Sequence, residues 1–467
     1  MKVILPFFAI ILFIFFQTAC KKDSFITNKD ALLVLSEDTL HFDTIFTTTG
    51  STTQFFKIFN RNNQKLLISS IQLAGGGNSF FKMNIDGISA INIKDVEIAA
   101  NDSLYGFVTV SINPNNSSLP FVVRDSIAIN YNGNTRYLQL DAFGKNAFFL
   151  RNKTIQNDTT FSNQLPIVIL GGLTVAESKI LTLQKGTKLY VNANAPIIVR
   201  GTLIANGEAF DSTKIELKGD RLDEPYKNYP AAWPGIYFTQ TSINNRLLHC
   251  MIQNSYQGVI VENPSSNTNP KLTLNACTFN NIYDVAIGAS NTSIVANNCL
   301  ISNCGYNVFI VSGGSYQFTN NTIVSYNNNY VEHKNPVVTI SNSNSNNIVN
   351  PLSCQFNNCV LYGEGGLVEN EIVLARNNSA SFNVSLNHVL YKVKTDIAPT
   401  LANITNSIKN VSPLFDSINA NARFFNFRPK QNSPLIDKGI NNALTFDLDG
   451  KARIVNNLID IGCYEKQ

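Results

Sequence analysis

Leu274-Asn275-Ala276-Cys277-Thr278-Phe279-Asn280 is one copy of a short phrase that decides the fold of this chain. Each copy has an Asn-rich approach, a Cys or a substitute for it, and an apolar residue two places further on. The marked position falls at Cys250, Cys277, Cys299, Thr322 and Cys359, which are 27, 22, 23 and 37 residues apart. A period of about 20 to 30 residues with short β-prone runs is typical of stacked coils. The repeat therefore predicts a solenoid, and it does not by itself name a ligand.

The spacing inside the phrase predicts which side chains face the core. Residues two positions apart on a strand point to the same face, so Cys250 with Ile252 and Cys277 with Phe279 are expected to point inward. Neighbouring coils lie about 4.8 Å apart, and a free Cys packs as a small hydrophobe. We therefore expect a structural column of thiols. A disulfide between stacked cysteines stays open, because Cα separations of roughly 4.4 to 6.8 Å permit one.

Composition narrows the class of protein and its partners. The chain has 467 residues, which favours two or three folded units. Only 15% of the residues are charged, and the formal net charge is +4 without a long basic run. Nucleic acid is therefore not an expected partner. Once Cys20 is set aside, seven cysteines remain at spacings unlike those of a zinc site, so no metal and no cofactor is predicted.

The N-terminus reads as a targeting segment. Lys2 precedes the apolar run of residues 3–16, and Gln17-Thr18-Ala19-Cys20 follows it. This pattern resembles a bacterial lipoprotein signal, although Gln17 stands where Leu is usual. The resemblance implies that residues 1–20 are a signal peptide and that Cys20 is lipidated. An ordinary signal peptide or an uncleaved anchor is the alternative.

Residues 21–35 are predicted to be a tether. Lys21-Lys22-Asp23 resembles the charged tract with which Bacteroidetes lipoproteins reach the cell surface. The resemblance implies a protein anchored to the outer membrane through its N-terminal lipid. Whether it faces the medium or the periplasm stays open, because so short a tract also fits a solvated tether.

Residues 36–150 alternate with period two between turn signals, which predicts an antiparallel β-sandwich. Residues 55–60 and 65–73 are expected to be neighbouring strands, and Asn132-Gly133-Asn134 a tight hairpin. The run from Asp38 to Phe46 resembles the N-terminal immunoglobulin-like module of many Bacteroidetes surface lipoproteins. His41 and Asp43 within it are expected to be surface residues, not catalytic ones.

A polar link over residues 151–164 is expected before the coils, which are predicted over 165–400. The runs from Gly186 to Ala205 and from Trp233 to Phe238 resemble right-handed parallel β-helix proteins of the pectate-lyase-like type. The predicted fold class is therefore all-β, with an immunoglobulin-like β-sandwich followed by a right-handed parallel β-helix and a C-terminal cap.

Residues 401–467 are predicted to close the solenoid by covering its last coil. Three phrases, Ser433 to Gly439, Asp447 to Arg453 and Ile459 to Glu465, resemble the closing module of secreted Bacteroidetes β-helix proteins. Asp447 and Asp449 are expected to make turns and pair with Arg453. A calcium loop is the alternative, but the run lacks the further ligands of a full site.

The densest polar patch is a long insertion just before Trp233. Long loops on rigid scaffolds commonly carry function. The candidate ligand-binding residues are Asp220, Arg221, Asp223, Glu224, Tyr226, Tyr229 and Trp233. The alternative is structural, with Arg221 and Lys227 pairing with the loop's acids to hold it flat.

The leading functional prediction is a non-catalytic cell-envelope lipoprotein that presents its β-helix for adhesion or glycan binding. Its expected partners are the membrane, through the lipid, and a polysaccharide or another surface protein. The alternative is a carbohydrate-active enzyme, either a polysaccharide lyase or a glycoside hydrolase. Glycoside hydrolysis needs a pair of carboxyl groups at fixed separation. Glu262, Asp284, Glu332 and Glu364 fall on different coils, so no catalytic residue is assigned.

Overall fold

The computed structural model describes residues 24–47, 49–114 and 121–467, and the chain divides into two compact units after Asn146. Both units are built of β-strands, which confirms the predicted fold class. Cys20 and the signal segment lie outside the described residues. Within the described ranges, no helix has the length and hydropathy that crossing a bilayer requires. The described residues include the short 3-10 helices η2 (Gly76–Asn78) and η3 (Tyr226–Asn228).

The first unit is a sandwich of two five-stranded sheets. One sheet has the order β1 (Leu33–Leu35), β3 (Gln54–Asn60), β8 (Ser103–Val110), β5 (Phe81–Ile85) and β6 (Ile88–Ser89). The other has the order β2 (Thr39–Phe46), β10 (Asn134–Lys145), β9 (Phe121–Tyr131), β4 (Leu66–Leu73) and β7 (Asn92–Ile98). Only β2 and β10 pair in parallel among these described strands. Alternate side chains such as Phe56 and Ile127 fill the space between the sheets.

Two local predictions for the sandwich meet different outcomes. Asn132 and Gly133 both have positive φ, 44° and 75°, which confirms the tight hairpin between β9 and β10. The prediction that residues 55–60 and 65–73 are neighbouring strands is wrong, because β3 and β4 belong to different sheets. Buried Asn60 stabilises the connection between the two sheets, because its Nδ2 donates to the carbonyls of Gln64, Ile98 and Ala99. His41 is exposed, and its ring pairs with Asp141 at 2.7 Å.

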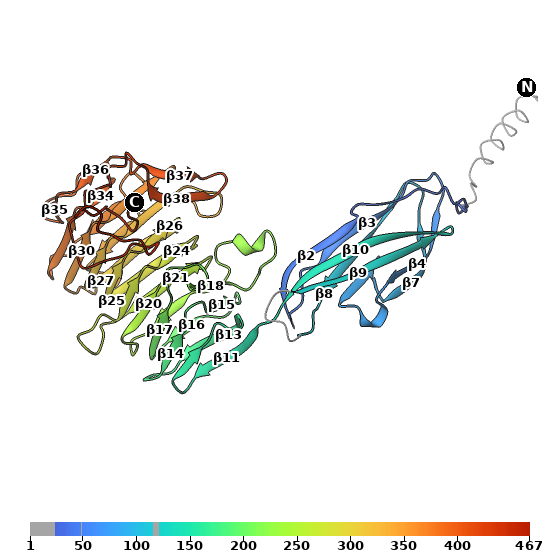
Figure 1. The fold of residues 1–467 in the computed structure, drawn as a ribbon, viewed down its shortest axis with the longest axis horizontal. Helices are drawn as coiled ribbons and strands as arrows, with labels where there is room; N and C mark the ends of the chain where they lie inside the picture. The colour runs from blue at the N-terminus through green and yellow to red at the C-terminus, as the bar shows by residue number, and fades with distance from the viewer. Residues whose placement is uncertain (1–23, 48, 115–120) are drawn as a thin grey trace, which may run out of the picture. The chain divides into compact units, whose positions relative to one another are not determined.

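The second unit is a parallel β-helix whose strands pair from coil to coil (Figure 1). Sheet A contains β15 (Lys188–Val191), β18 (Ile215–Gly219), β21 (Cys250–Gln253), β24 (Thr278–Asn280), β26 (Leu300–Ser302), β28 (Thr322–Tyr326), β31 (Val360–Glu364), β34 (Leu390–Tyr391) and β36 (Ile408–Lys409). Sheet B contains β16 (Ile197–Val199), β19 (Ile236–Phe238), β22 (Val259–Glu262), β29 (Val338–Ser341) and β32 (Ile372–Ala375). Sheet C contains β12 (Thr159–Phe161), β14 (Ile180–Leu183), β17 (Thr202–Asn206), β20 (Asn245–Leu248), β23 (Leu272–Asn275), β30 (Leu352–Asn357), β33 (Phe382–Asn387) and β35 (Asn403–Thr405).

Four long strands bend from one sheet into the next. Strands β11 (Phe148–Ile155) and β13 (Ile167–Val175) run through sheets A and B, and β25 (Val285–Asn297) and β27 (Tyr306–Thr319) run through sheets B and C. The expected polar link over residues 151–164 is therefore wrong, because β11 and β12 already pair with the next coil. Leu150, Ile155 and Phe161 point into the core there, and the polar residues between them face outward.

The cysteine column lies in the core, with one correction to its members. The strand register aligns Cys250, Cys277, Cys299, Asn321 and Cys359, so Asn321 and not Thr322 takes the marked place. Asn321 fits because its Oδ1 accepts from the Cys299 amide at 2.7 Å and its Nδ2 donates to the Ala296 carbonyl at 2.8 Å. The described cysteines are all buried and free. Burial raises the pKa of Cys359 to about 12, so its thiol stays protonated.

The corner before each column residue has one backbone conformation. His249, Ala276, Asn298, Asn320 and Asn358 have φ of 46°, 51°, 53°, 54° and 52°. These values are left-handed, and Asn adopts that region more readily than most residues. The Asn-rich approach in the repeat is thus the bend that carries the chain from sheet C into sheet A.

The C-terminal segment covers a lateral face of the β-helix. The hairpin of β37 (Phe415–Asn419) and β38 (Phe424–Pro429), with the residues that follow, packs on the outer face of sheet A. The covered outward side chains of sheet A include Leu300, Val324, Tyr326, Val360, Tyr362 and Leu390, and Phe415, Phe427, Leu435, Leu448 and Ile461 pack over them. The prediction that this segment covers the last coil is therefore corrected, since its apolar contacts run along several coils.

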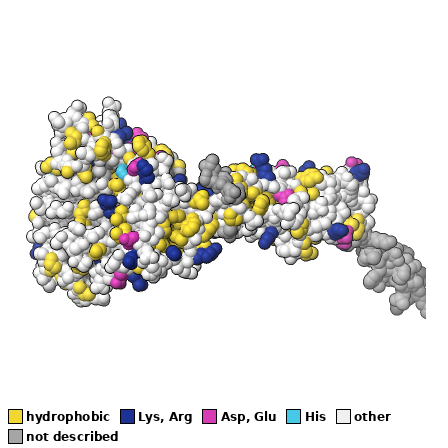
Figure 2. Space-filling model, turned by 60° about the horizontal axis from the view of Figure 1, so that its bottom comes forward, with side chains coloured by type: hydrophobic (Ala, Val, Ile, Leu, Met, Phe, Trp, Pro, Cys, Tyr) yellow, Lys and Arg dark blue, Asp and Glu magenta, His cyan; other side chains and the backbone are white. Residues whose placement is uncertain are grey.

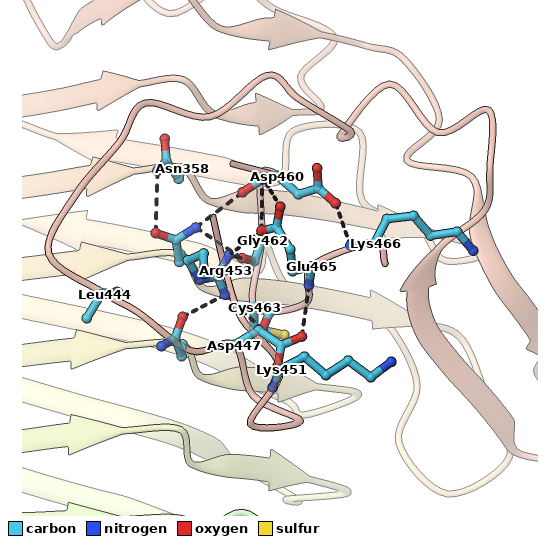
Figure 3. A network of polar contacts seen from close by, with 12 residues as sticks. Asn358, Leu444, Asp447, Lys451, Arg453, Asp460, Gly462, Cys463, Glu465 and Lys466 are labelled. Carbon is cyan, nitrogen blue, oxygen red and sulfur yellow. Dashed lines mark hydrogen bonds and ion pairs between the residues drawn. The ribbon is translucent and has the colours of Figure 1, made fainter. Parts of the chain in front are cut away.

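Buried charges fasten this segment (Figure 3). Arg453 is fully buried and donates to Asn298 Oδ1 at 2.7 Å and to Glu465 at 3.4 Å. Asp460 and Asp447 accept backbone amides, which include those of Lys466 and Lys451. Arg453 pairs with Glu465, whereas Asp449 pairs with Arg428 at 2.6 Å, so the expected pairing of Asp449 with Arg453 is wrong.

Candidate functional site

The outer face of sheet A changes character along the stack. One register column runs Gln253, Asn280, Ser302, Val324 and Tyr362, from amides to apolar residues. The C-terminal segment covers the apolar part. A groove of about 230 Å³ lies where the cover ends. We name it the amide groove, and its lining residues are Asn228, Gln253, Asn254, Asn280, Asn281, Asn303, Asn328, Ala422, Arg423 and Phe425.

The floor of the amide groove is set by the corner between sheets A and B. Asn254, Asn281 and Asn303 follow β21, β24 and β26 and have left-handed φ of 60°, 56° and 55°. The Asn281 Nδ2 donates to Asn254 Oδ1 and to the Asn228 carbonyl, each at 2.9 Å. The same bend in three successive coils therefore brings three amides side by side, and the 220–230 loop is tied to them.

Asn303 has an unused donor in this floor. Its side chain is 2% exposed, and its Oδ1 accepts from the Tyr326 amide at 2.9 Å. Its Nδ2 has no hydrogen-bond partner among the described residues. Buried amide groups are nearly always paired, and an unpaired one calls for a water or a ligand. This Nδ2 is therefore an unpaired donor buried behind the groove lining, with almost no exposed area of its own.

Aromatic rings and guanidinium groups form a wall that adjoins the amide groove, and Arg423 is the member of it that lines the groove. Arg221 lies 4.0 Å from the Tyr226 ring centre, and the rings of Tyr226 and Tyr229 are 5.5 Å apart. The Tyr229 and Tyr330 rings are 5.4 Å apart, and Arg423 lies 3.7 Å from the Tyr330 ring centre. This Arg–Tyr wall joins the 220–230 loop, the loop after β28 and the tip of the β37–β38 hairpin. Such contacts hold loops from distant parts of the chain together.

The predicted ligand-binding residues do not line the amide groove, to which their loop contributes Asn228 instead. Tyr226 and Tyr229 are 43% and 39% exposed in the wall. Arg221 makes a bidentate pair with Asp223 at 2.7 Å, and Glu224 pairs with Lys227 at 2.6 Å. The alternative that ion pairs hold the loop therefore applies to these charged residues.

Asp220 and Trp233 do not belong to the wall. The Asp220 carboxylate accepts from Asn192 at 2.8 Å. Trp233 is fully buried in the core, and its Nε1 donates to the Gln253 carbonyl at 2.9 Å. The prediction that Trp233 offers a surface to a ligand is wrong, because an apolar ring with one satisfied donor is more stable inside the first coils.

Sequence reasoning missed the residues that complete the groove. Asn281, Asn303 and Arg423 were not predicted as site residues, although each lies at its lining. The recurring Asn after each sheet A strand is a signal that could have identified the first two. Nothing in the sequence ties Arg423 to coils that lie more than a hundred residues earlier.

Arg423 is the charged residue among those that line the amide groove. On the face drawn in Figure 2, charged side chains are isolated spots on a mostly uncharged surface. Arg423 has no ion-pair partner in the described part of the chain, so its charge is available to a ligand. In the ranges that the structure covers, no three His, Cys, Asp or Glu side chains are grouped to hold a metal ion.

A buried His–Glu pair adjoins the groove. A depression of about 410 Å³ shares Asn328 with the amide groove and includes His333. The His333 Nε2 lies 2.9 Å from a Glu371 carboxylate oxygen, and both side chains are almost inaccessible. Gly363 makes the space for them, because a Cβ there would lie 2.2 Å from Glu371 and 2.4 Å from His333. This burial makes the pair part of the coil interior.

Comparison with known proteins assigns no family. No family model and no curated protein matches the chain. A family 123 glycoside hydrolase from Clostridium perfringens is similar with a TM-score of 0.18 and 10% identity, over 24% of this chain and 26% of that chain. A human PapD-like domain, domain 7 of CEP192, is similar with a TM-score of 0.17 and 7% identity, over 24% of this chain and 82% of that chain. At such TM-scores neither likeness bears on fold or activity, and the chain spans about a quarter of that hydrolase.

Proposed function

We propose that this protein is a non-catalytic cell-envelope protein that binds a glycan in the amide groove. The observation that carries the proposal is a groove lined by seven Asn and Gln side chains. Amide groups both donate and accept, which matches the hydroxyl and ring oxygens of a sugar. Ligand sites are concave and have a few polar groups fixed in orientation.

The wall adds a second kind of contact. Tyr229 and Tyr226 present partly exposed rings in the adjoining wall, and Arg423 adds to the lining a cation that has no ion-pair partner among the described residues. Aromatic rings pack against the apolar faces of sugars, and a guanidinium group donates several hydrogen bonds in one plane. The lining is thus suited to holding a saccharide, whereas glycoside hydrolysis uses two carboxyl groups.

Binding is tested with the full chain in detergent against a panel of neutral and acidic polysaccharides, by calorimetry and affinity electrophoresis. Asn303→Asp keeps the oxygen that accepts from Tyr326 and replaces the donor with an acceptor. We expect it to weaken binding of the retained glycan about tenfold. Asn263→Asp is the matched control, because Asn263 is an exposed corner residue with φ of 63° outside the groove. Equal affinities of the two variants would contradict the proposal.

The same incubation separates binding from catalysis. Retention of the glycan without new reducing ends or unsaturated sugars is the expected result. Release of either product would replace the binding proposal with the enzyme proposal, in which the protein acts on an extracellular polysaccharide.

Localisation is part of the proposal and rests on the sequence. We propose an outer-membrane anchor through a lipid on Cys20, which places the folded units on one side of the membrane. Protease treatment of intact cells tests surface display. Digestion of the chain is expected, and an intact chain would indicate a periplasmic location instead.

A further inference from the structure

A second groove crosses the outer face of sheet C. Two depressions of about 590 and 410 Å³ meet there, because Ser353, Ser381 and Asn383 line both. We name the merged depression the sheet C groove. It shares no lining residue with the amide groove, whose residues lie on sheet A and at its corner.

The floor of the sheet C groove repeats in register. One column of outward side chains runs Ser293, Ser315, Ser353 and Asn383, and the next runs Gln317, Gln355, Ser385 and Asn403. All eight are uncharged and polar. Because coils lie about 4.8 Å apart, each column presents a hydrogen-bonding group at that regular interval along the axis.

Most of this hydrogen-bonding capacity is unused. The side chains of Ser353, Gln355, Asn383 and Ser385 have no hydrogen-bond partner among the described residues, in contrast to Ser293, whose Oγ accepts from the Lys271 amide at 3.0 Å. Their backbones are already paired with neighbouring coils. The side-chain donors and acceptors of the floor are therefore free to meet a ligand or water.

Two segments form the walls and are fixed by polar contacts. On one wall, Asn267 and Asn269 each donate to Asn244 Oδ1, at 3.1 and 3.0 Å. On the other, Arg376 donates to the Thr400 carbonyl at 3.0 Å. The cation nearest the floor thus already has a partner, and the rest of the lining is uncharged.

We propose that the sheet C groove binds an uncharged linear polysaccharide that lies along the axis of the β-helix. A repeating floor of hydroxyl and amide groups matches a ligand that repeats its own hydroxyl groups at a similar interval. An extended chain of hexopyranose units has such a repeat, close to one sugar for each coil. A compact ligand would use only one coil of the floor.

The test uses the full chain in detergent and unbranched neutral β-glucan oligosaccharides, in a length series from disaccharide to hexasaccharide. We expect the affinity to rise with length, because each added sugar meets a further coil. Asn383→Leu removes the donor and the acceptor at a position shared by both depressions, on an exposed strand surface. We expect it to weaken hexasaccharide binding about tenfold.

Two controls make the outcome specific. Asn206→Leu lies on the same sheet outside both depressions, so it is expected to bind the hexasaccharide as the unchanged protein does. Unchanged thermal unfolding of Asn383→Leu shows that its loss of affinity is local. Length-independent binding, no binding, or a loss in Asn206→Leu that equals the loss in Asn383→Leu would overturn the inference. Failure of the Asn303→Asp test leaves this inference standing, since the two grooves share no residue.

Discussion

The outer face of sheet A is open near the first coils and covered over the later ones. One register column shows the difference: Met251 and Thr278 are half-buried, whereas Val360 and Leu390 are fully buried beneath the C-terminal segment. Both stretches have the same backbone and the same core behind them. What differs is the outward side chains, so these decide whether a coil face binds the rest of its own chain or remains available to a ligand.

The largest effect on stability is expected from removing the buried charge of Arg453, which holds the C-terminal segment on sheet A. Arg453→Met leaves Glu465 buried without its cation and Asn298 without its donor. Breaking a buried pair costs about 3 to 5 kcal/mol. We expect hydrogen exchange to speed up across the 433–467 segment and to change little in β21 and β24.

Arg428→Met is the control for that change. Its pair with Asp449 is bidentate, but the Arg428 side chain is 45% exposed, so solvent screens the pair. The loss is expected to be under about 1 kcal/mol. Equal losses for the two variants would show that the cover is not held by its buried charge.

The matched truncations Leu390→Ala and Met251→Ala sharpen the comparison at two positions of one column. Leu390 is fully buried under the cover, so its truncation is expected to cost about 2 to 4 kcal/mol in the free energy of unfolding. Met251 is half-buried without a cover, and we expect less than about 1 kcal/mol. Denaturant unfolding measures both, and a reversed order would contradict the assignment of the covered stretch.

The stability of the cover is also expected to depend on pH. Burial raises the pKa of Glu465 to about 8, and burial also raises the pKa values of Asp447 and Asp460. A folded state that holds a proton which the unfolded chain has lost becomes less stable as pH rises. The contribution of Glu465 is therefore complete below about pH 4.5 and is lost as pH rises through about 8.

Melting temperatures measured from mildly acidic to mildly alkaline pH check this direction. We expect them to fall as pH rises, and to fall less in Glu465→Gln, which cannot lose a proton. A melting temperature that rises toward alkaline pH in the unchanged protein would refute the role of these acids.

The coils could be predicted from the sequence because their cause is local. Each short strand has two inward residues and must stack on its neighbour, so the Cys phrase indicates both the strand and its face. The exact register could not be read where Asn320, Asn321 and Thr322 are all polar. Only the pairing of Leu300 with Thr322 shows that Asn321 is the inward residue.

The candidate site was predictable only in part. The 220–230 loop is recognisable as an insertion, but it contributes Asn228 to the groove lining, whereas Tyr226 and Tyr229 lie in the adjoining Arg–Tyr wall. The prediction for Trp233 was wrong because a Trp next to a polar loop was expected to be exposed. In the structure its ring is buried in the core, and its Nε1 donates to the Gln253 carbonyl. Arg423 reaches the groove through tertiary packing of a segment distant in sequence, which no local pattern encodes.

The corner before sheet A has the same backbone conformation in the coils of the cysteine column, so the strands stay aligned even though the coils differ in length. Register-matched positions at Cys277, Cys299, Asn321 and Cys359 are 22, 22 and 38 residues apart, yet the residue before each has the same left-handed backbone. Extra residues therefore leave the stack between corners without shifting the strands that follow. Loops between the corners of this scaffold can therefore be lengthened or replaced while the stacking of the coils stays the same.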